Sequence, residues 1–139
     1  MKRKLLAALL ALSLLIPAGC GSSGAGSDVD IDRTKLSATM VYSEVFNMLY
    51  TPEDYLGKTV NMEGTFTEYY DETLDKHYYA CIIQDATACC AQGIEFVLAE
   101  PRTPEEYPEE GSFITVRGVF DVYEEDGYQF VQLVDAAMR

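Results

Sequence analysis

The sequence is poor in positive charge. Ten Lys and Arg residues stand against 23 Asp and Glu residues, which gives a net charge of −13. Three of the ten cations lie within the first four residues, so cleavage after residue 19 leaves 7 basic residues and a net charge of −16. Because proteins hold nucleic acid largely by neutralising phosphates with Lys and Arg, we expect no nucleic-acid partner. A cation, a cationic protein surface or a neutral molecule suits this charge, although acidity can also serve only solubility.

Catalytic motifs are equally scarce. His77 is the single histidine, and the local sequence offers it no serine partner for a catalytic triad. The chain has neither a Gly-rich phosphate loop nor the H-E-x-x-H pattern of zinc proteases. We therefore expect a protein that is not an enzyme and that needs no cofactor.

The first twenty residues carry a targeting pattern. A basic start precedes an apolar run at residues 5–16, which is shorter than the roughly 20 residues that span a bilayer. Small residues and then Cys20 follow, as at a signal-peptide cleavage site. The segment resembles the lipobox of bacterial lipoproteins, with Pro17 where that family usually has Leu. The resemblance implies that residues 1–19 are removed and that Cys20 is lipidated, which places the protein on the bacterial cell membrane, facing outside the cytoplasm. An ordinary secreted protein with a chance cysteine is the alternative.

A tether is predicted next. Residues 21–27 contain only Gly, Ser and Ala, the composition of a flexible linker. Three aspartates between residues 28 and 32 add charge that extends such a linker. We therefore assign residues 20–35 to the lipidated cysteine and its tether. Residues 36–139 remain for the working domain, about 100 residues, which is enough for one small core.

The domain is predicted to open with a helix. Apolar residues recur at spacings near three and four between Met40 and Leu49, which is typical of an amphipathic helix. Ser37 is placed to be its N-cap. Thr51 and Pro52 then indicate a second short turn, with proline at its first helical position.

Strand patterns fill the rest of the domain. Polar and apolar residues alternate from Val60 to Thr67, which indicates a strand with one buried face. Four further strands are predicted at residues 78–85, 94–98, 114–122 and 128–134. Asp126-Gly127 is typical of a tight hairpin of type I′. Three prolines crowd residues 101–111, so we expect an extended acidic loop there.

Two of these strands share a pattern, Gly-x-Phe-x-x-Tyr, which begins at Gly64 and again at Gly118. Glycine weakens a strand unless the strand must bend, and small barrels need such bends in order to close. The pattern favours a mainly β fold, a small five-stranded OB-like barrel preceded by one or two short helices.

The chain also resembles a family. Residues 55–60, followed by the Gly-x-Phe strand, resemble the opening of OB-fold domains in small bacterial membrane lipoproteins. Residues 81–96 resemble a vicinal-cysteine segment of such lipoproteins, and a related segment occurs in the soluble part of a family of permease subunits. The likeness covers about residues 50–137. It implies an OB-like fold and a cell-envelope location, but it implies no reaction. The chain departs from the usual OB fold between the third and fourth strands, where the prolines of residues 101–111 replace the usual helix by a loop.

Three cysteines remain if Cys20 carries lipid. Cys81, Cys89 and Cys90 could form a disulfide from Cys81 to one of the other two, hold zinc as three thiolates, or stay as buried, inert thiols. A disulfide between the adjacent pair is possible but strained. We expect the turn after strand 78–85 to bring Cys89 or Cys90 within disulfide range of Cys81, with Cα atoms about 4.4–6.8 Å apart. His77 precedes Cys81 by about 13 Å of extended strand, so it is a weak metal candidate that should point elsewhere.

Four tyrosines flank one predicted hairpin and are weak candidates for stacking on a flat ligand such as a sugar: Tyr69, Tyr70, Tyr78 and Tyr79. Packing of these rings against one another explains them equally well. The first functional hypothesis is a membrane-anchored module that binds a ligand or a partner near a transporter or another cell-envelope protein. The alternative is a zinc-binding or thiol-redox protein that uses the three cysteines of the domain.

Overall fold

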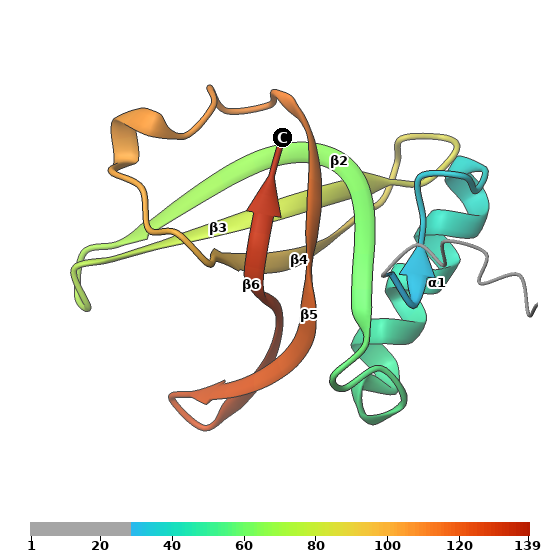
Figure 1. The fold of residues 1–139 in the computed structure, drawn as a ribbon, viewed down its shortest axis with the longest axis horizontal. Coiled ribbons are helices and arrows are strands. Elements are labelled where there is room, and N and C mark those ends of the chain that lie inside the picture. The colour runs from blue at the N-terminus through green and yellow to red at the C-terminus, as the bar shows by residue number, and fades with distance from the viewer. Residues whose placement is uncertain (1–28) are drawn as a thin grey trace, which may run out of the picture.

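The computed structural model describes residues 29–139 (Figure 1). In chain order the elements are β1 (Ile31–Asp32), α1 (Ala38–Tyr50), the 3-10 turn η1 (Pro52–Asp54), β2 (Thr59–Asp71), β3 (Lys76–Gln84), β4 (Ala91–Leu98), the 3-10 turn η2 (Pro104–Glu106), β5 (Phe113–Glu125) and β6 (Tyr128–Met138). The predicted mainly β class with an N-terminal helix is confirmed. The signal segment, Cys20 and most of the predicted tether lie outside the described residues.

Five of the strands are joined in a ring of hydrogen-bonded pairs. The sheet order is β1-β2-β3-β4-β6-β5, and an additional pairing joins β2 to β5. β4 and β6 run parallel, whereas the other neighbouring pairs of the ring are antiparallel. All five predicted strands are present, and β2 and β5 run several residues beyond their predicted ends. These extensions form long hairpins that project beyond the ring.

β2 changes its partner near its middle. Up to Thr65 it pairs with β5, and from Thr65 onward it pairs with β3. Gly64 stands at this change, where a Cβ atom would lie 2.4 Å from the carbonyl oxygen of Ile82. Gly118 lies at the irregularity between β5 and β6, where a Cβ atom would lie 2.9 Å from the carbonyl oxygen of Val134. The two glycines therefore allow strands to approach more closely than a side chain would permit.

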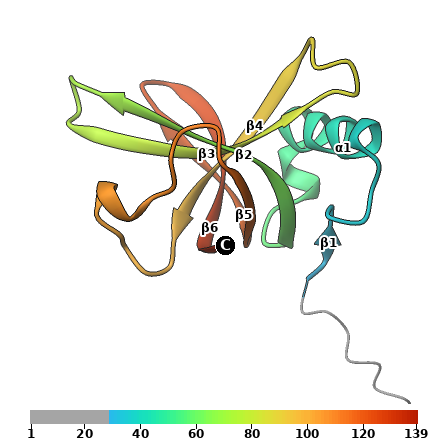
Figure 2. The ribbon, with the colours of Figure 1, turned by 90° about the horizontal axis from the view of Figure 1, so that it is seen from above.

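The core fills the ring and the space beneath α1. Its fully buried members are large and apolar: Phe66, Phe96, Phe120, Met48, Met62, Ile94, Leu133, Val45, Val60, Val116 and Cys81. α1 contributes one face to this core, within the predicted apolar stripe. Ser37 precedes the helix as predicted, but its side chain makes no capping hydrogen bond. Figures 1 and 2 show α1 and β1 together at one end of the molecule.

The fold begins earlier than the sequence analysis placed it. Residues 31–32 were assigned to the tether, but they form β1 and pair in parallel with β2. The carboxylate of Asp30 accepts the backbone N–H of Thr59 at 2.8 Å, and that of Asp32 accepts the side-chain amide of Asn61 at 3.3 Å. These aspartates are hydrogen-bond acceptors that dock the chain onto β2, and their charge alone did not distinguish this role from that of a solvated linker.

A long loop at residues 99–112 joins β4 to β5. The three residues of η2 are its only regular structure, in keeping with the predicted extended loop. Tyr107 stacks on Tyr79 of β3 with ring centroids 3.8 Å apart, which holds the loop against the ring. In Figures 1 and 2 this loop and the β2–β3 hairpin lie on the side away from α1.

Candidate functional site

Two hollows adjoin on the part of the ring that carries the projecting hairpins. One has a volume of about 470 Å³ and lies beside the 99–112 loop, and the other has a volume of about 430 Å³ and lies between the β2–β3 and β5–β6 hairpins. Both are lined by Tyr78, Glu95 and Tyr123. We call the two hollows together, joined at these three residues, the aromatic groove.

The hairpins place the rings of the groove. Tyr78 lies opposite Tyr69 across β2 and β3, and their ring centroids are 6.2 Å apart. Tyr123 lies opposite Phe130 across β5 and β6, with centroids 5.4 Å apart. The β5–β6 hairpin closes at Asp126-Gly127, where both residues have positive φ, 51° and 80°. This is the backbone that the predicted type I′ turn requires.

Glu95 lies where the two hollows meet. The hydroxyl of Tyr123 donates a hydrogen bond to its carboxylate at 2.6 Å. Burial raises the pKa of Glu95, and the hydrogen bond from Tyr123 opposes that rise. Burial, together with the hydrogen bond to Glu95, also raises the pKa of Tyr123. The pair therefore presents a half-buried carboxylate beside a phenol that keeps its proton at neutral pH.

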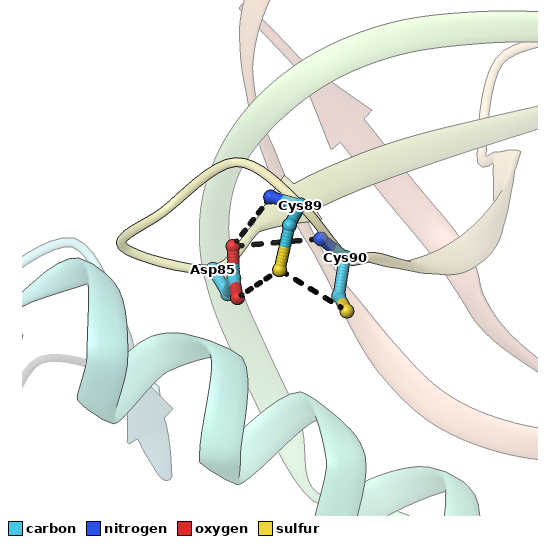
Figure 3. Close-up of side chains that lie close together, drawn as sticks. All are labelled: Asp85, Cys89 and Cys90. Atoms are coloured by element: carbon cyan, nitrogen blue, oxygen red, sulfur yellow. Dashed lines mark hydrogen bonds between the residues drawn. The ribbon is translucent and has the colours of Figure 1, made fainter.

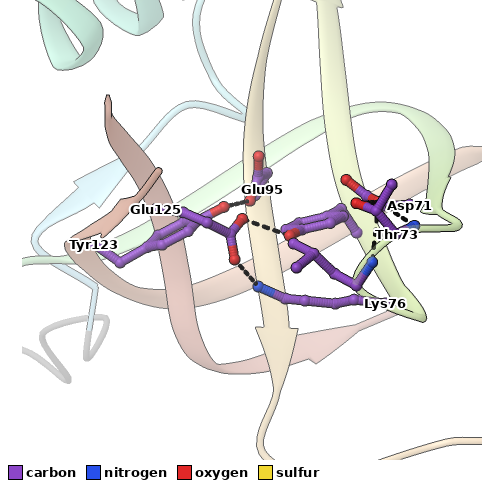
Figure 4. Close-up of polar contacts among 8 residues, drawn as sticks. Asp71, Thr73, Lys76, Glu95, Tyr123 and Glu125 are labelled. Atoms are coloured by element: carbon purple, nitrogen blue, oxygen red, sulfur yellow. Dashed lines mark hydrogen bonds and ion pairs between the residues drawn. The ribbon is translucent and has the colours of Figure 1, made fainter. Parts of the chain in front are cut away.

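A second polar cluster links the two hairpins across the groove (Figure 4). The ammonium of Lys76 contacts the carboxylate of Glu125 at 2.8 Å, and the hydroxyl of Tyr78 also donates to Glu125. Lys76 lies 4.2 Å from the ring centroid of Tyr78 and 5.5 Å from that of Tyr123. Hydrogen bonds from Lys76 and then Tyr78 lower the pKa of Glu125. The cluster holds charges and rings of both hairpins in a fixed arrangement.

The four predicted tyrosines divide between the two hollows. Tyr78 lines both, Tyr79 lines the first and Tyr69 lines the second. The ring of Tyr69 is 64% exposed, so it is open to a ligand. Tyr70 lines neither hollow. Its ring lies tilted against that of His77, with centroids 4.5 Å apart, and its hydroxyl donates a hydrogen bond to Asp75 at 2.7 Å.

Several groove residues were not singled out from the sequence. Tyr107 and Tyr123 line the first hollow, Tyr123 and Tyr128 line the second, and Tyr128 is 71% exposed. The repeated Gly-x-Phe-x-x-Tyr pattern was a signal for one of them, because it places Tyr123 at the position that corresponds to Tyr69. No comparable signal marks Tyr107, which reaches the groove only because the 99–112 loop folds back onto β3.

His77 lies apart from the cysteines, as predicted. It stands near the start of β3, where its Nδ1 atom pairs with the carboxylate of Glu68, and its ring stacks parallel to that of Tyr79. Cys89 and Cys90 lie beyond the other end of β3. The full set of three cysteines and one histidine therefore does not converge on a common point.

Cys81 also lies apart from the other two cysteines, which corrects the expectation that one of them lies within disulfide range. It pairs in register with Ile94, three positions from the last pair of the β3–β4 ladder, Gln84 and Ala91. That is about 10 Å of strand, and Cys90 lies beyond it. Cys81 is fully buried, and burial, with a smaller effect of the Glu63 charge, raises the pKa of its thiol to about 12. It packs as an inert apolar residue, the third of the alternatives considered for the cysteines.

Cys89 and Cys90 are exposed and free in the turn between β3 and β4. Asp85, the first residue of that turn, lies beside both (Figure 3). The groups that lie together are therefore two thiols and one carboxylate, not the three thiols that were predicted. Asp85 was not predicted as a ligand, because aspartate at the start of a turn is ordinarily a structural residue.

Comparisons with family models, with curated proteins and with solved structures each found no match. Among residues 29–139, no helix combines the length and the apolar character needed to cross a bilayer.

Proposed function

We propose that this protein is an extracytoplasmic lipoprotein whose OB-like domain binds a polar ligand, neutral or cationic, in the aromatic groove. The observation that carries the proposal is the groove itself. Tyrosine rings and carboxylates from two projecting hairpins converge on one hollowed part of the ring. The domain then serves as a binding or accessory module beside a transporter or another cell-envelope protein.

The strand pairing supports an OB-like arrangement. An OB fold is a five-stranded, partly open Greek-key barrel that binds its ligands on its second and third strands and on the loops after strands one and four. With β2 counted as the first strand of the ring, those elements are β3, β4 and the β2–β3 and β5–β6 hairpins. The aromatic groove is lined from these same elements and from the 99–112 loop.

The charges of the second hollow favour a ligand without negative charge, whereas Lys76 and Arg102 line the first hollow. The second hollow is lined by four carboxylates, those of Asp71, Glu95, Glu125 and Asp126, and its lining contains no Lys or Arg. Exposed tyrosine rings beside it offer flat apolar faces with polar edges. A sugar ring, which has an apolar face and many hydroxyl groups, fits this combination, and an amino sugar fits it better because its cation meets carboxylates.

A three-probe binding experiment tests the proposal. Ligand-observed NMR is run with a neutral trisaccharide, an amino-sugar trisaccharide and a uronic-acid trisaccharide. We expect the amino sugar to bind best, the neutral sugar next, and the uronic acid not at all. Tyr78→Ala should abolish the binding, whereas Tyr50→Ala, which removes an exposed tyrosine ring of α1 outside the groove, should leave it unchanged. Preference for the acidic probe, or binding that survives Tyr78→Ala, contradicts the proposal.

The same charges argue against nucleic acid as the ligand. Single-strand binders combine stacking rings with a positively charged groove, whereas carboxylates outnumber Lys and Arg in the lining of this groove. A fluorescence titration with single-stranded DNA and RNA at physiological salt should show no binding. Micromolar affinity would overturn the electrostatic reasoning.

The proposed anchor is tested separately at Cys20. Cys20→Ala should prevent lipid attachment, so that the protein stays unprocessed or leaves the membrane fraction. Mass spectrometry of the membrane-extracted protein gives the readout. A mature, lipid-bearing product from the variant would reject the anchor and leave the groove proposal unaffected.

A further inference from the structure

The turn between β3 and β4 is built around one carboxylate. The backbone N–H of Asp85 donates to the carbonyl of Cys90, and that of Ala88 donates to the carbonyl of Asp85, both at 3.0 Å. The Oδ1 atom of Asp85 accepts the backbone N–H of Thr87 at 3.2 Å and that of Cys89 at 3.0 Å. Because several donors of the turn converge on Oδ1, the carboxylate has a fixed orientation.

That orientation turns the second oxygen toward the thiols. The Sγ atom of Cys89 lies 3.3 Å from Oδ2 of Asp85 and 3.6 Å from Sγ of Cys90. One ligand atom from each of the three residues lies within 4.8 Å of the other two. Figure 3 shows the two sulfur atoms and Oδ2 on one side of the turn, where both cysteines are exposed.

These separations match those of ligands around a tetrahedral ion. Two sulfur atoms each about 2.3 Å from zinc are ~3.8 Å apart at the tetrahedral angle, and a sulfur and a carboxylate oxygen at about 2.1 Å are ~3.6 Å apart. The observed 3.6 Å and 3.3 Å are each shorter by a few tenths of an ångström. The third pair, Oδ2 of Asp85 and Sγ of Cys90, lies within 4.8 Å.

We propose that Asp85, Cys89 and Cys90 form a zinc site with three protein ligands and a fourth position open to solvent. The two thiols bind as thiolates and the carboxylate through Oδ2, while Oδ1 keeps its hydrogen bonds to the turn. Neither Cys81 nor His77 takes part. The site lies outside the aromatic groove and does not depend on the proposed ligand.

The chemistry of the three ligands selects zinc over other ions. Calcium and magnesium take oxygen ligands almost exclusively, so two thiolates exclude them. Copper(I) prefers soft sulfur ligands, whereas zinc accepts thiolates together with carboxylate oxygen. The mature chain is strongly acidic, which favours the approach of any cation.

A hydroxyl of α1 lies beside Cys90. Tyr42 of α1 hydrogen-bonds the thiol of Cys90, and its oxygen lies 3.5 Å from Nε2 of Gln92, which donates to it. The phenol proton is therefore free to point at the sulfur. Hydrogen-bonding partners of this kind orient metal ligands, and their loss typically costs about 10–100-fold in metal affinity.

The experiment uses the full chain with Cys20→Ser, so that the only exposed thiols of the domain are those of the turn. The reduced protein is mixed with zinc alone and analysed by native mass spectrometry, and cobalt(II) is then substituted to detect thiolate-to-metal charge transfer by absorption. We expect one bound zinc ion and a charge-transfer band. Cys89→Ser and Cys90→Ser should each weaken zinc binding by about 10-fold or more, as the loss of even an outer partner does.

A matched pair of aspartates isolates the role of Asp85. Asp85→Asn should weaken binding about as strongly as the cysteine variants, and Asp71→Asn should not change it. Asp71 has the same turn geometry at the other end of β3 but has no cysteine beside it. Circular dichroism of each variant shows whether it is folded. Full zinc binding by Asp85→Asn, or by the double variant Cys89→Ser and Cys90→Ser, overturns the assignment.

The oxidised protein gives an additional outcome. A disulfide between Cys89 and Cys90 would remove both thiolates, so oxidation should abolish zinc binding and prior zinc loading should slow the oxidation. If the reduced protein retains no zinc, the proposal is wrong and the two thiols are a redox pair or inert.

Discussion

The two turns at the ends of β3 begin with the same pattern but lead into different surfaces. Each starts with Asp-x-Thr, at Asp71 and at Asp85, and in each the carboxylate accepts both the N–H and the hydroxyl of the threonine. The first turn then leads into Lys76 and the aromatic groove, and the second leads into Cys89 and Cys90. The same hydrogen-bonded turn therefore occurs at two different surfaces. The residues after the threonine determine which functional groups each surface carries.

The middle of β3 connects these two ends and packs closely against Gly64 of β2. We therefore expect substitutions at this contact to destabilise the fold most. Gly64→Ala places a Cβ atom 2.4 Å from the backbone oxygen of Ile82 and 2.8 Å from the sulfur of Cys81. Backbone cannot move aside easily, so we expect the free energy of unfolding to fall by about 3 kcal/mol, the upper part of the usual range for overpacking. Urea denaturation followed by circular dichroism measures it.

Gly93→Ala is the matched control for that prediction. Its Cβ atom would lie 2.5 Å from Cδ1 of Ile82, the far end of a flexible side chain. This atom can rotate away, so the loss should be about 1 kcal/mol, at the lower end of the overpacking range. Equal losses for the two variants would show that β2 and β3 are less closely packed than the structure indicates.

Tyr107→Ala should loosen the structure at the groove end of β3 and leave the thiol end unchanged. It removes a ring stacked at 3.8 Å on Tyr79 and so frees the 99–112 loop. A stack of this kind contributes about 0.5–1.5 kcal/mol beyond the buried area. Hydrogen exchange should become faster in peptides that cover the loop and should not change in those that cover residues 85–90. Faster exchange at both ends would mean that the ends are coupled through the strand.

Glu95→Gln tests how the ionisation of a carboxylate in the aromatic groove affects the stability of the fold. Burial raises the pKa of Glu95 in the folded protein, so the protonated form is favoured by folding and the ionised form opposes it. The contribution of Glu95 to stability is thus fully present below about pH 4.3, the value for an unfolded glutamate, and is lost as the pH rises through the higher folded pKa. At pH 7 the variant should be more stable than the wild type. The gain should be less than about 1 kcal/mol, because water screens a half-exposed group.

Denaturation at pH 7 and at pH 3.5 provides the measurement, and the two proteins should be nearly equal at the lower pH. Glu124→Gln, at an exposed position on the β5–β6 hairpin, should show no comparable gain. A larger gain for Glu95→Gln at the lower pH would reverse the sign of the reasoning.

The smallest effects are expected at the aspartates themselves. Asp71→Asn and Asp85→Asn each weaken hydrogen bonds to a turn, but asparagine still accepts part of them. Each should lower the free energy of unfolding by about 0.5 kcal/mol, the lower limit for a hydrogen bond. Chemical denaturation without added metal should not distinguish the two, so any difference in zinc binding then reflects the cysteines rather than the fold.

Local patterns in the sequence predicted the elements well. Local strand patterns located all five strands, the apolar stripe located α1, and Asp126-Gly127 identified its turn, because each of these features depends on residues close together in the chain. Gly64 and Gly118 were recognised as special positions. The reason for them, a contact with a strand from elsewhere in the sequence, required the structure.

The candidate sites depend on strand register, which the sequence did not supply. A turn after strand 78–85 was foreseen, but its pairing places Cys81 opposite Ile94 and so leaves it in the core. Tyr123 and Glu95 meet across strands that are distant in the chain, and Tyr107 arrives from an irregular loop. Asp30 and Asp32 read as linker charges because the groups that they bind, on β2, lie about thirty residues away.

The docking of β1 fixes the end of the domain at which the N-terminal segment enters. The chain enters the fold at Ile31, and the segment after β1 adjoins the end of β3 that leads to the thiol turn. With the anchor that we propose at Cys20, the eleven residues up to Ile31 reach at most about 40 Å. In Figures 1 and 2 the entry point and the β2–β3 hairpin lie at opposite ends of the molecule. In a protein anchored as we propose, the thiol turn would lie at the tethered end of the domain and the aromatic groove at the far end.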